Sequence, residues 1–507
     1  MQIRNNIDPG ELSHYHGFFP GIRFYSLRTL FVHLLHFLSW YLGAKITLAV
    51  PEEFEYFKDD HENLRAIRIL KHLKDLGFVS SFYEYKQEYS DEPNGRTMFV
   101  RLAGSKRLGY VGRGSDITDR KKIVWPALGE AVERYSLQHF TASPIDILKS
   151  STKDLNRPKV DVLAMAGFST EERTRRHPDF NLSLNADSVF GWVVASKVLT
   201  REEIWAPMQL FSFDYLIKNA GLIGAGHDTI AREDKEPLLR APISTGAAAG
   251  QTLDQAILSG LLEIIERDAF IIYWLNQMVA KRINLKSFQE ERFSTLLKIA
   301  EEYQLEPYAL YLQTDAPVHT VCSIVIDRTG FGPAVLVGAS SGFNLGDVTY
   351  KAFSESLSNR DPMRGFMERN LDRLDRGSKN IYHMDHEGRI LHWFQSSTIK
   401  DIEHFISGQE VNASSLPYYE VSSKPLDSLV RFMHEKDYTV IFKDITSPVL
   451  KNIIEGVKVA MVVVPEMQPL YLEESLRETG GGRLKEIPEL LGKSINASFC
   501  NIPHPFP

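Results

Sequence analysis

Cysteine is almost absent from this sequence, which has two in 507 residues. Cys322 and Cys500 lie far apart, so a disulfide framework and a Cys-x-x-Cys metal or redox site are both excluded. A long apolar run is missing too. The most apolar stretch, 30–50, is interrupted by two histidines and a lysine, and its clean part is shorter than the roughly 20 apolar residues of a membrane span. We expect a buried or amphipathic helix there and no membrane span.

A surplus of positive charge is also lacking, because 65 Asp and Glu outnumber 58 Lys and Arg for a net charge of −7. Broad binding to nucleic acid or to an anionic membrane needs such a surplus, so we expect no nucleic-acid partner. The first residues lack the charged-then-apolar order of a signal peptide, which predicts a cytoplasmic protein. The charged and aromatic fractions, 24% and 11%, are typical of a folded globular chain.

The pattern along the chain predicts two regions. Residues 1–75 read as an N-terminal accessory region with helices at 26–42 and 62–76, and 76–507 as the main domain. Residues 111–116 read as a glycine turn before a helix that begins near Trp125. The expected strands, rich in Val and Ile, are 189–196, 320–327, 334–339, 438–443 and 457–464. Strands that alternate with helices predict an α/β or α+β fold.

One local motif occurs twice, as Glu130-Ala-Val-Glu133-Arg134 and as Glu263-Ile-Ile-Glu266-Arg267. Residues at i, i+3 and i+4 share a helix face, so each copy presents two carboxylates and a guanidinium together. A lone copy is typical of a solvated ion-pair ladder. The repetition, and the apolar neighbours of the second copy, favour a buried site whose charges need partners.

Small residues precede the second copy. The segment 244–250, Ser-Thr-Gly-Ala-Ala-Ala-Gly, reads as a turn that opens a helix and offers backbone N–H groups to phosphate. If both glutamate helices face one cavity, their carboxylates could hold Mg²⁺ on the phosphates of a nucleotide. Neither a Walker A sequence nor a Gly-x-Gly-x-x-Gly turn occurs. A di-iron centre expects Glu-x-x-His, so magnesium is the favoured metal.

With these motifs in order, residues 109–507 resemble the YcaO superfamily, ATP-dependent enzymes that activate backbone amides. The motifs that carry the resemblance are Gly112-Arg-Gly, Ala127-Leu-Gly-Glu-Ala-Val-Glu-Arg-Tyr135, Ile204-Trp-Ala-Pro-Met-Gln-Leu-Phe211, Ser244-Thr-Gly-Ala-Ala-Ala-Gly-Gln251, Gly260-Leu-Leu-Glu-Ile-Ile-Glu-Arg-Asp-Ala-Phe270 and Ala352-Phe-Ser-Glu-Ser-Leu-Ser-Asn-Arg360. The resemblance implies a YcaO-like fold with mixed sheets and an ATP and Mg²⁺ site between the two Glu-x-x-Glu-Arg helices.

The resemblance also implies roles for single residues. The magnesium ligands it implies are Glu130, Glu133, Glu263 and Glu266. The nucleotide-binding residues it implies are Arg134, Gln251, Gln255, Arg267, Glu355 and Asn359. Many members carry Asn and Glu where this chain has Gln251 and Gln255, and Gln where it has Asn359. Many also carry Ser in place of Pro126. These departures affect nucleotide contacts and leave the four glutamates in place.

The tail Pro503-His-Pro-Phe-Pro507 resembles that of the azoline-forming branch, the cyclodehydratases of thiazole- and oxazole-modified peptides. Alternating prolines favour a stiff extended chain. In the implied reaction, a Cys, Ser or Thr side chain of a ribosomally made precursor peptide attacks the preceding carbonyl. The resulting oxyanion is phosphorylated at the expense of ATP, and elimination gives a thiazoline or oxazoline. By resemblance, the carboxylate of Pro507 is the candidate catalytic base.

The resemblance implies partners as well: the precursor peptide, a leader-binding protein related to ubiquitin-activating proteins and, in many systems, a flavin-dependent azoline dehydrogenase. The oligomeric state, a homodimer included, is left open. Two other functions also stay open at this point. One is thioamide or amidine formation, and the other is a catalytically silent scaffold that binds nucleotide or peptide.

Overall fold

The computed structural model describes residues 52–506 apart from 58, 104–110, 141, 221–234, 377–383, 421 and 497. The chain divides into two compact units, Met1–Ser81 and Phe82–Pro507. The expected helix at 26–42, the apolar stretch 30–50 and the proposed base Pro507 lie outside the described residues. No described helix combines the length and the apolar character that crossing a membrane requires.

The first unit contains the helix α2 (His61–Asp75), which confirms the helix expected at 62–76. Asp60 caps its N-terminus, because its side chain accepts a hydrogen bond from the backbone N–H of Asn63 at 3.1 Å. Leu64, Ile67 and Leu70 form a buried stripe at the three-residue spacing of an amphipathic helix.

The remaining elements alternate strands and helices in the way that the sequence predicts. The further helices are α3 (Val124–His139), α4 (Thr170–Thr174), α5 (Phe213–Asn219), α6 (Leu253–Leu275), α7 (Glu291–Glu302), α8 (Leu345–Ser358), α9 (Arg360–Glu368), α10 (Leu371–Arg376), α11 (His386–His392), α12 (Ile399–Ile406), α13 (Pro425–Glu435), α14 (Pro448–Ile453) and α15 (Arg483–Leu490). The strands are β1 (Val79–Glu84), β2 (Arg96–Leu102), β3 (Val111–Asp116), β4 (Leu148–Ser151), β5 (Val189–Lys197), β6 (Glu203–Pro207), β7 (Ala247–Gly250), β8 (Lys281–Asn284), β9 (Leu305–Tyr311), β10 (His319–Asp327), β11 (Val335–Gly342), β12 (Glu410–Asn412), β13 (Ile441–Asp444) and β14 (Lys458–Val463). All five strands predicted from Val and Ile content are present.

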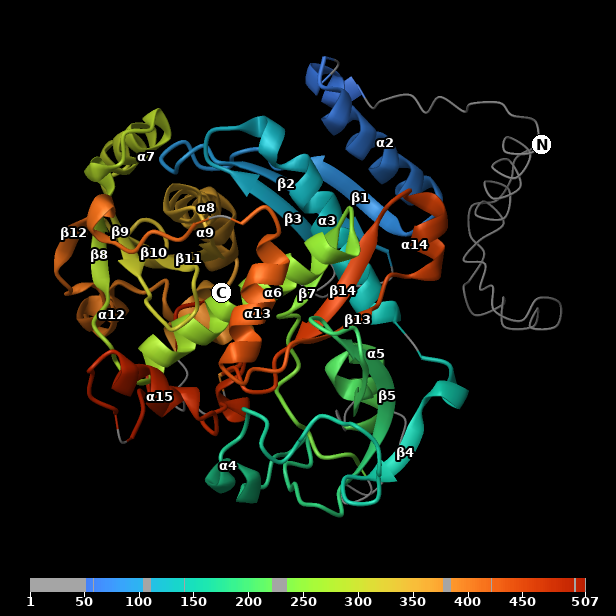
Figure 1. The fold of residues 1–507 in the computed structure, drawn as a ribbon. Helices are drawn as coiled ribbons and strands as arrows, with labels where there is room; N and C mark the ends of the chain where they lie inside the picture. The colour runs from blue at the N-terminus through green and yellow to red at the C-terminus, as the bar shows by residue number, and fades with distance from the viewer. Residues whose placement is uncertain are drawn as a thin grey trace, which may run out of the picture. The chain divides into compact units, whose positions relative to one another are not determined.

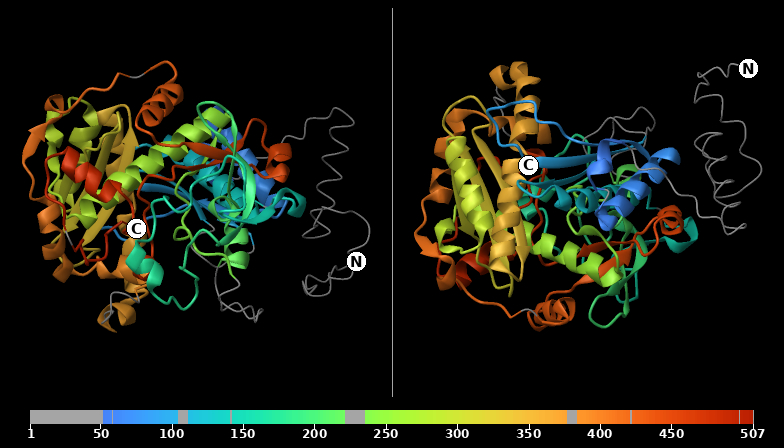
Figure 2. Two further views of the ribbon diagram at one scale, coloured as in Figure 1. Left: turned by 60° about the horizontal axis from the view of Figure 1, so that its bottom comes forward. Right: turned by 90° about the horizontal axis from the view of Figure 1, so that it is seen from above.

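One sheet has the strand order β11-β10-β9-β8-β12. Its β8 and β12 are parallel, whereas β8 to β11 pair in antiparallel fashion. Alternate residues of β10 face opposite sides: Cys322 and Ile324 lie in a core with the end of α6, and Val321 and Val325 lie in a core with α7 and α8. The sheet is therefore a buried layer between helices, which can be followed in Figure 2.

A second sheet has the order β4-β5-β13-β14-β7, and β6 pairs with β5. The first half of α6 packs on this sheet, since Ile257, Leu261 and Ile265 share a core with Ala460 and Val462 of β14. The second half of α6 packs on the first sheet. Helix α6 is thus common to both sheets and crosses the middle of the view in Figure 1. Its glutamates lie where the two sheets meet it.

The glycine turn expected at 111–116 is wrong, because these residues form β3, which pairs with β2. The two glycines serve close packing instead. A Cβ atom on Gly112 would come within 2.4 Å of the backbone nitrogen of Ala131, and one on Gly114 within 2.0 Å of the carbonyl oxygen of Ile123. These glycines allow α3 to lie directly on the strand.

The turn expected to open a helix at 244–250 is also corrected. Its alanines form β7, an edge strand paired with β14, and the helix begins only at Leu253, after the N-cap Thr252. The turn itself is at Gly246, which has φ +93°. A Cβ atom on Gly260 would lie 2.4 Å from the carbonyl oxygen of Gly246, so α6 touches this turn.

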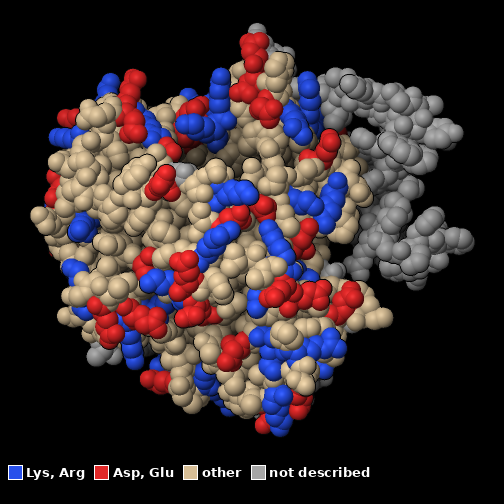
Figure 3. All heavy atoms as spheres, viewed as in Figure 1, with Lys and Arg blue, Asp and Glu red and all other residues tan. Residues whose placement is uncertain are grey.

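The face of the molecule seen in Figure 3 carries Lys and Arg interspersed with Asp and Glu. This mixture agrees with a net charge close to balance in a chain of this length.

Candidate functional site

Helix α3 presents the first Glu-x-x-Glu-Arg motif beside β3. The backbone N–H of Arg113 in β3 donates to Oε2 of Glu130 at 2.7 Å. Nη2 of Arg134 donates to Oε1 of the same carboxylate at 3.2 Å, and Nε of Arg134 lies 4.0 Å from Oε1 of Glu133. The first glutamate of the motif is therefore held by a backbone N–H and by its own arginine.

Helix α6 repeats this arrangement with the second motif. The backbone N–H of Gly246 donates to Oε2 of Glu263 at 3.1 Å, and Nη2 of Arg267 donates to Oε1 of Glu263 at 3.4 Å. Nη1 of Arg267 lies 3.3 Å from Oε1 of Glu266. In both helices the first glutamate accepts a backbone N–H from a preceding strand or turn, and the arginine bridges the two glutamates.

The two motifs are linked through the turn before β7. Nη1 of Arg134 donates to Oγ of Ser244 at 2.7 Å, and Gly246, two residues later, binds Glu263. The turn is therefore held by the arginine of one motif and the glutamate of the other. The structure brings together the two motifs that the sequence analysis assigns to one site.

Burial and like charge alter the ionisation of the second glutamate in each motif. Burial raises the pKa of Glu133 well above its ordinary value, and the negative charges of Glu263 and Glu130 add to the rise. Burial also raises the pKa of Glu266, to about 7, with a further rise from Glu355. In both cases the adjacent arginine opposes the rise. Both pKa values are nevertheless raised, so the neighbouring arginines do not fully offset the cost of burying these two negative charges.

The donor set fits a hard cation that arrives with phosphate. No three His, Cys, Asp or Glu side chains within the described ranges converge closely enough to hold a metal ion on their own. Mg²⁺ needs only one or two carboxylates, with water and substrate phosphates as its other ligands. The buried Nε of Arg134 has no hydrogen-bond partner among the described residues, which leaves a donor for an anion. The assignment of the four glutamates as magnesium ligands stays a prediction.

The residues expected near the nucleoside lie at the start of α6. Gln251 follows β7 directly, and Oε1 of Gln255 accepts the backbone N–H of Gln251 at 3.1 Å. Both side chains are exposed. Gln255 precedes Glu263 by eight residues, about 12 Å along the helix axis. Their role in nucleotide binding stays a prediction.

The third expected segment reaches the site from α8. Oε1 of Glu355 lies 4.0 Å from Nη2 of Arg113, and its charge raises the pKa of Glu266. Asn359 is the C-terminal cap of α8, it is buried, and its Oδ1 has no hydrogen-bond partner in the part of the chain that the structure describes. Glu355 therefore adjoins the glutamate cluster, and Asn359 offers a free acceptor one turn later.

Three site residues have no assigned role in the sequence analysis. Arg113 contacts both Glu130 and Glu355, Ser244 receives Arg134, and the positive charge of Lys351 lowers the pKa of Glu266. The glycines on either side of Arg113 are a signal of close backbone approach that could have pointed to it. Ser244 begins the small-residue segment 244–250 that the sequence marks as a turn, whereas Lys351 carries no such local signal.

Cys322 lies near the cluster but is not poised for reaction. Burial raises the pKa of its thiol, and the negative charges of Glu266 and Glu355 raise it further. A thiol of raised pKa stays protonated at neutral pH and is a poor nucleophile.

A small cavity of about 60 Å³ adjoins the site on the side of α6. Thr245, Ile264 and Arg267 belong to its wall, which is mostly apolar. A group that reacts beside Arg267 therefore has space that protein atoms do not fill.

Comparison with known proteins places the chain in a family. The family model described as YcaO cyclodehydratase, ATP- and Mg²⁺-binding, matches residues 125–468. The comparison with curated protein sequences found no match. The matched range begins in α3 and contains both Glu-x-x-Glu-Arg motifs and the Glu355 segment.

Solved structures share the fold at low sequence identity. A heterocyclase in complex with substrate and cofactor matches with a TM-score of 0.65 and 18% identity over 87% of this chain and 57% of that chain. The YcaO protein of Methanopyrus kandleri, bound with AMPPCP and Mg²⁺, matches with a TM-score of 0.54 and 16% identity over 83% of this chain and 94% of that chain. The E. coli microcin synthetase complex McbBCD matches with a TM-score of 0.52 and 14% identity over 84% of this chain and 96% of that chain.

This chain spans only 57% of the first heterocyclase and 50% of the heterocyclase TruD. Identities this low establish a common fold. The family model covers most of the chain, including α3, α6 and α8 with their site residues, and so the chain belongs to the YcaO family.

Proposed function

We propose that this protein is an ATP-dependent cyclodehydratase that converts Cys, Ser or Thr of a ribosomally made precursor peptide to thiazoline or oxazoline. The observation that carries the proposal is the paired arrangement of Glu130 with Arg134 and Glu263 with Arg267 around one turn. Two carboxylates with raised pKa values, that of buried Glu266 and that of largely buried Glu133, lie next to arginines with unsatisfied donors. This arrangement is suited to a cation and a phosphate chain.

In the proposed mechanism the protein's share is positioning and charge stabilisation. Glu130, Glu133, Glu263 and Glu266 would hold Mg²⁺, and Arg134 and Arg267 would neutralise phosphate oxygens. Bound Mg-ATP would supply the phosphoryl group that makes the amide oxygen a leaving group. Because the pKa values of Glu133 and Glu266 are raised, cation binding would compete with protons for these two carboxylates.

The nucleotide contacts are also proposals. Gln251 and Gln255 would lie near the nucleoside, and Glu355 and Asn359 would complete the phosphate and metal surroundings. The unpartnered Oδ1 of buried Asn359 supports its part in this proposal. The catalytic base assigned to Pro507 stays a prediction.

We also propose partner proteins, from the similarity to solved heterocyclase and synthetase structures. The E. coli neighbour is the microcin synthetase complex McbBCD with pro-MccB17 bound. By analogy with that complex, we expect a leader-binding protein to deliver the precursor peptide to this chain. An azoline dehydrogenase would act on the product.

The test uses the purified protein with a precursor peptide and a leader-binding protein sought among the genes that neighbour its own. Phosphate release from ATP and the intact mass of the peptide are measured for wild type, Glu263→Gln and a control, Glu171→Gln, whose side chain is 80% exposed. We expect wild type and the control to remove one water per ring. Glu263→Gln should release phosphate about 10- to 100-fold more slowly, the loss of activity typical of a disturbed metal site.

Each contrary outcome selects another function. ATP consumption without loss of water would favour thioamide or amidine chemistry. Binding of the precursor peptide without ATP consumption would favour the silent scaffold. Equal activity of Glu263→Gln and wild type would remove the proposed magnesium site.

A further inference from the structure

The segment 502–506 lies along the second half of α6. Nε1 of Trp274 donates to the carbonyl oxygen of Ile502 at 3.0 Å. The ring of Phe270, one turn earlier, lies 5.9 Å from that of His504 and 5.0 Å from that of Phe506. The segment therefore runs antiparallel to the helix, and its alternate residues contact one helix face.

The contact nearest the candidate site is between Phe506 and Arg267. The guanidinium carbon of Arg267 lies 3.9 Å from the ring centroid of Phe506, which is a close cation–π geometry. Phe506 is 3% exposed, so its ring also shields this side of the guanidinium from water. Arg267 is the residue that bridges Glu263 and Glu266.

The other side of the segment is fixed by residues outside α6. Nε1 of Trp393 donates to the carbonyl oxygen of Pro503 at 3.0 Å. Nε2 of the fully buried His504 lies 2.7 Å from the carbonyl oxygen of Tyr471, and Nη1 of Arg389 lies 2.5 Å from Nδ1 of the same ring. Burial lowers the pKa of His504 well below its ordinary value, so the ring is neutral and can accept from Arg389 while it donates to Tyr471.

The carboxylates hold Arg267 only loosely. Its two contacts, 3.4 Å to Glu263 and 3.3 Å to Glu266, are longer than the 2.7–2.9 Å of a strong charge-assisted hydrogen bond. Its Nη1 lacks a hydrogen-bond partner within the described residues. A third contact is needed to fix the plane of the guanidinium, and the ring of Phe506 supplies it.

We propose that Phe506 is a positioning residue of the nucleotide site, whose ring fixes the guanidinium of Arg267 and thereby the carboxylates of Glu263 and Glu266. The inference rests on the proposed function, because it assigns Arg267 to the phosphates of Mg-ATP. It extends that function to a residue outside the two Glu-x-x-Glu-Arg motifs, through the ring face that Phe506 presents to Arg267. Phe506 itself touches no reacting atom.

The experiment separates the ring's electronic role from its volume. Phe506→Leu keeps an apolar side chain without a π-face, Phe506→Tyr keeps the face, and Trp393→Phe removes the hydrogen bond to Pro503 while leaving Phe506 intact. Binding of AMPPCP with Mg²⁺ is measured by calorimetry on the full chain, with kcat and KM for ATP hydrolysis and circular dichroism as a check of folding.

We expect Phe506→Leu to weaken AMPPCP binding about three- to thirtyfold, the loss that a desolvated cation–π contact produces. Phe506→Tyr and Trp393→Phe should bind like wild type. If Phe506→Leu does not fold, Phe506→Met takes its place, because methionine fills irregular core space.

The inference is overturned if Phe506→Leu or Phe506→Met binds AMPPCP as tightly as wild type does. It is also overturned if Phe506→Tyr or Trp393→Phe weakens AMPPCP binding as much as Phe506→Leu does. Wild type that does not bind AMPPCP would instead remove the proposed function. The two failures are therefore distinguishable.

Discussion

Glu266 shows how a single residue carries the electrostatics of the site. Burial is the largest cause of its raised pKa, and Glu355 and Glu263 raise it further, while Arg267 and Lys351 lower it. The ordinary value of 4.5 applies in the unfolded chain, and the value in the folded protein is about 7. Between these two values the folded protein keeps a proton that the unfolded chain releases.

This difference predicts a pH dependence of stability. The contribution of Glu266 is fully present below pH 4.5 and is lost as the pH rises to about 7, so the free energy of unfolding falls across that window. Glu266→Gln removes the titrating carboxyl. In this variant we expect the free energy of unfolding to fall less steeply between pH 4.5 and 7, by up to about 1.4 kcal/mol per pH unit. Urea unfolding at a series of pH values without divalent cations measures it, with the exposed Glu489→Gln as control. Parallel curves for wild type and Glu266→Gln would contradict the assignment.

At the scale of elements, the contact between β3 and α3 sets the position of Glu130. A methyl group on Gly114 would collide with the carbonyl oxygen of Ile123 at 2.0 Å, and backbone cannot yield as a flexible side chain does. We expect Gly114→Ala to lower the free energy of unfolding by about 1–3 kcal/mol, as overpacking does. Urea denaturation measures the change.

The same helix offers a matched control. A Cβ atom on Gly129 meets nothing within 4 Å, and alanine favours a helix over glycine by up to about 1 kcal/mol. We expect Gly129→Ala to leave stability unchanged or to raise it. Equal loss in both variants would mean that close approach is not the reason for Gly114.

Periodicity predicts the elements that have strong side-chain patterns. Helix α2 follows from its apolar residues three apart, and β10 and β14 follow from runs of Val and Ile. The segments β3 and β7 were not predicted as strands, because glycine and alanine carry weak conformational signals. Their conformation follows from the helices packed against them.

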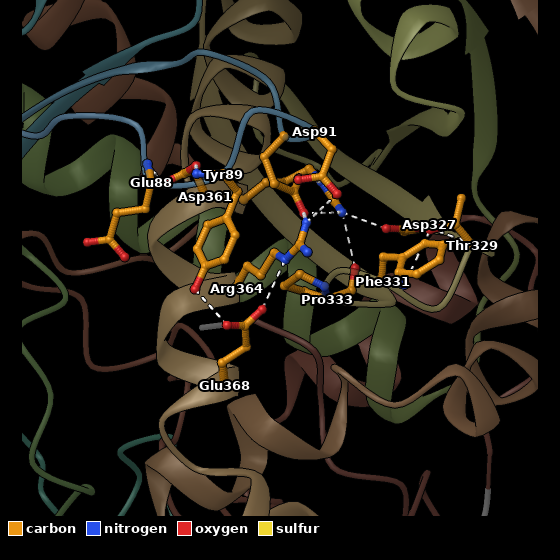
Figure 4. A network of polar contacts seen from close by, with 12 residues as sticks. Glu88, Tyr89, Asp91, Asp327, Thr329, Phe331, Pro333, Asp361, Arg364 and Glu368 are labelled. Carbon is orange, nitrogen blue, oxygen red and sulfur yellow. Dashed lines mark hydrogen bonds and ion pairs between the residues drawn. The ribbon is translucent and has the colours of Figure 1, made fainter.

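At the scale of the second unit, a buried charge network joins three parts of the chain. Arg360 at the start of α9 is 1% exposed, and its guanidinium reaches Oε2 of Glu92 and Oδ2 of Asp327, each at 2.7 Å. Figure 4 shows the neighbouring Arg364 between Asp91 and Glu368. The network ties the segment before β2 and the end of β10 to α9.

We expect Arg360→Met to destabilise the protein by about 3–5 kcal/mol, because it leaves buried Asp327 without its cation and buried Glu92 with only the 3.7 Å contact to Arg364. The control is Arg328→Met, whose partner Glu306 is exposed and whose loss should cost about 0–1 kcal/mol. Urea midpoints of the two variants measure the difference. Similar midpoints would show that the network carries no more stability than a surface pair.

The sequence by itself determined the faces of the site, because the helical repeat places Glu263, Glu266 and Arg267 on one side of whatever helix they form. It also determined the mixed α/β class, through alternating strand and helix patterns. Tertiary structure alone decided that Arg113, Ser244 and Lys351 join those glutamates, and that segment 502–506 runs along α6 to Arg267. These contacts join residues far apart in the chain. A local sequence pattern does not predict which helix face the glycine-containing strand β3 or the proline-rich segment 502–506 will contact.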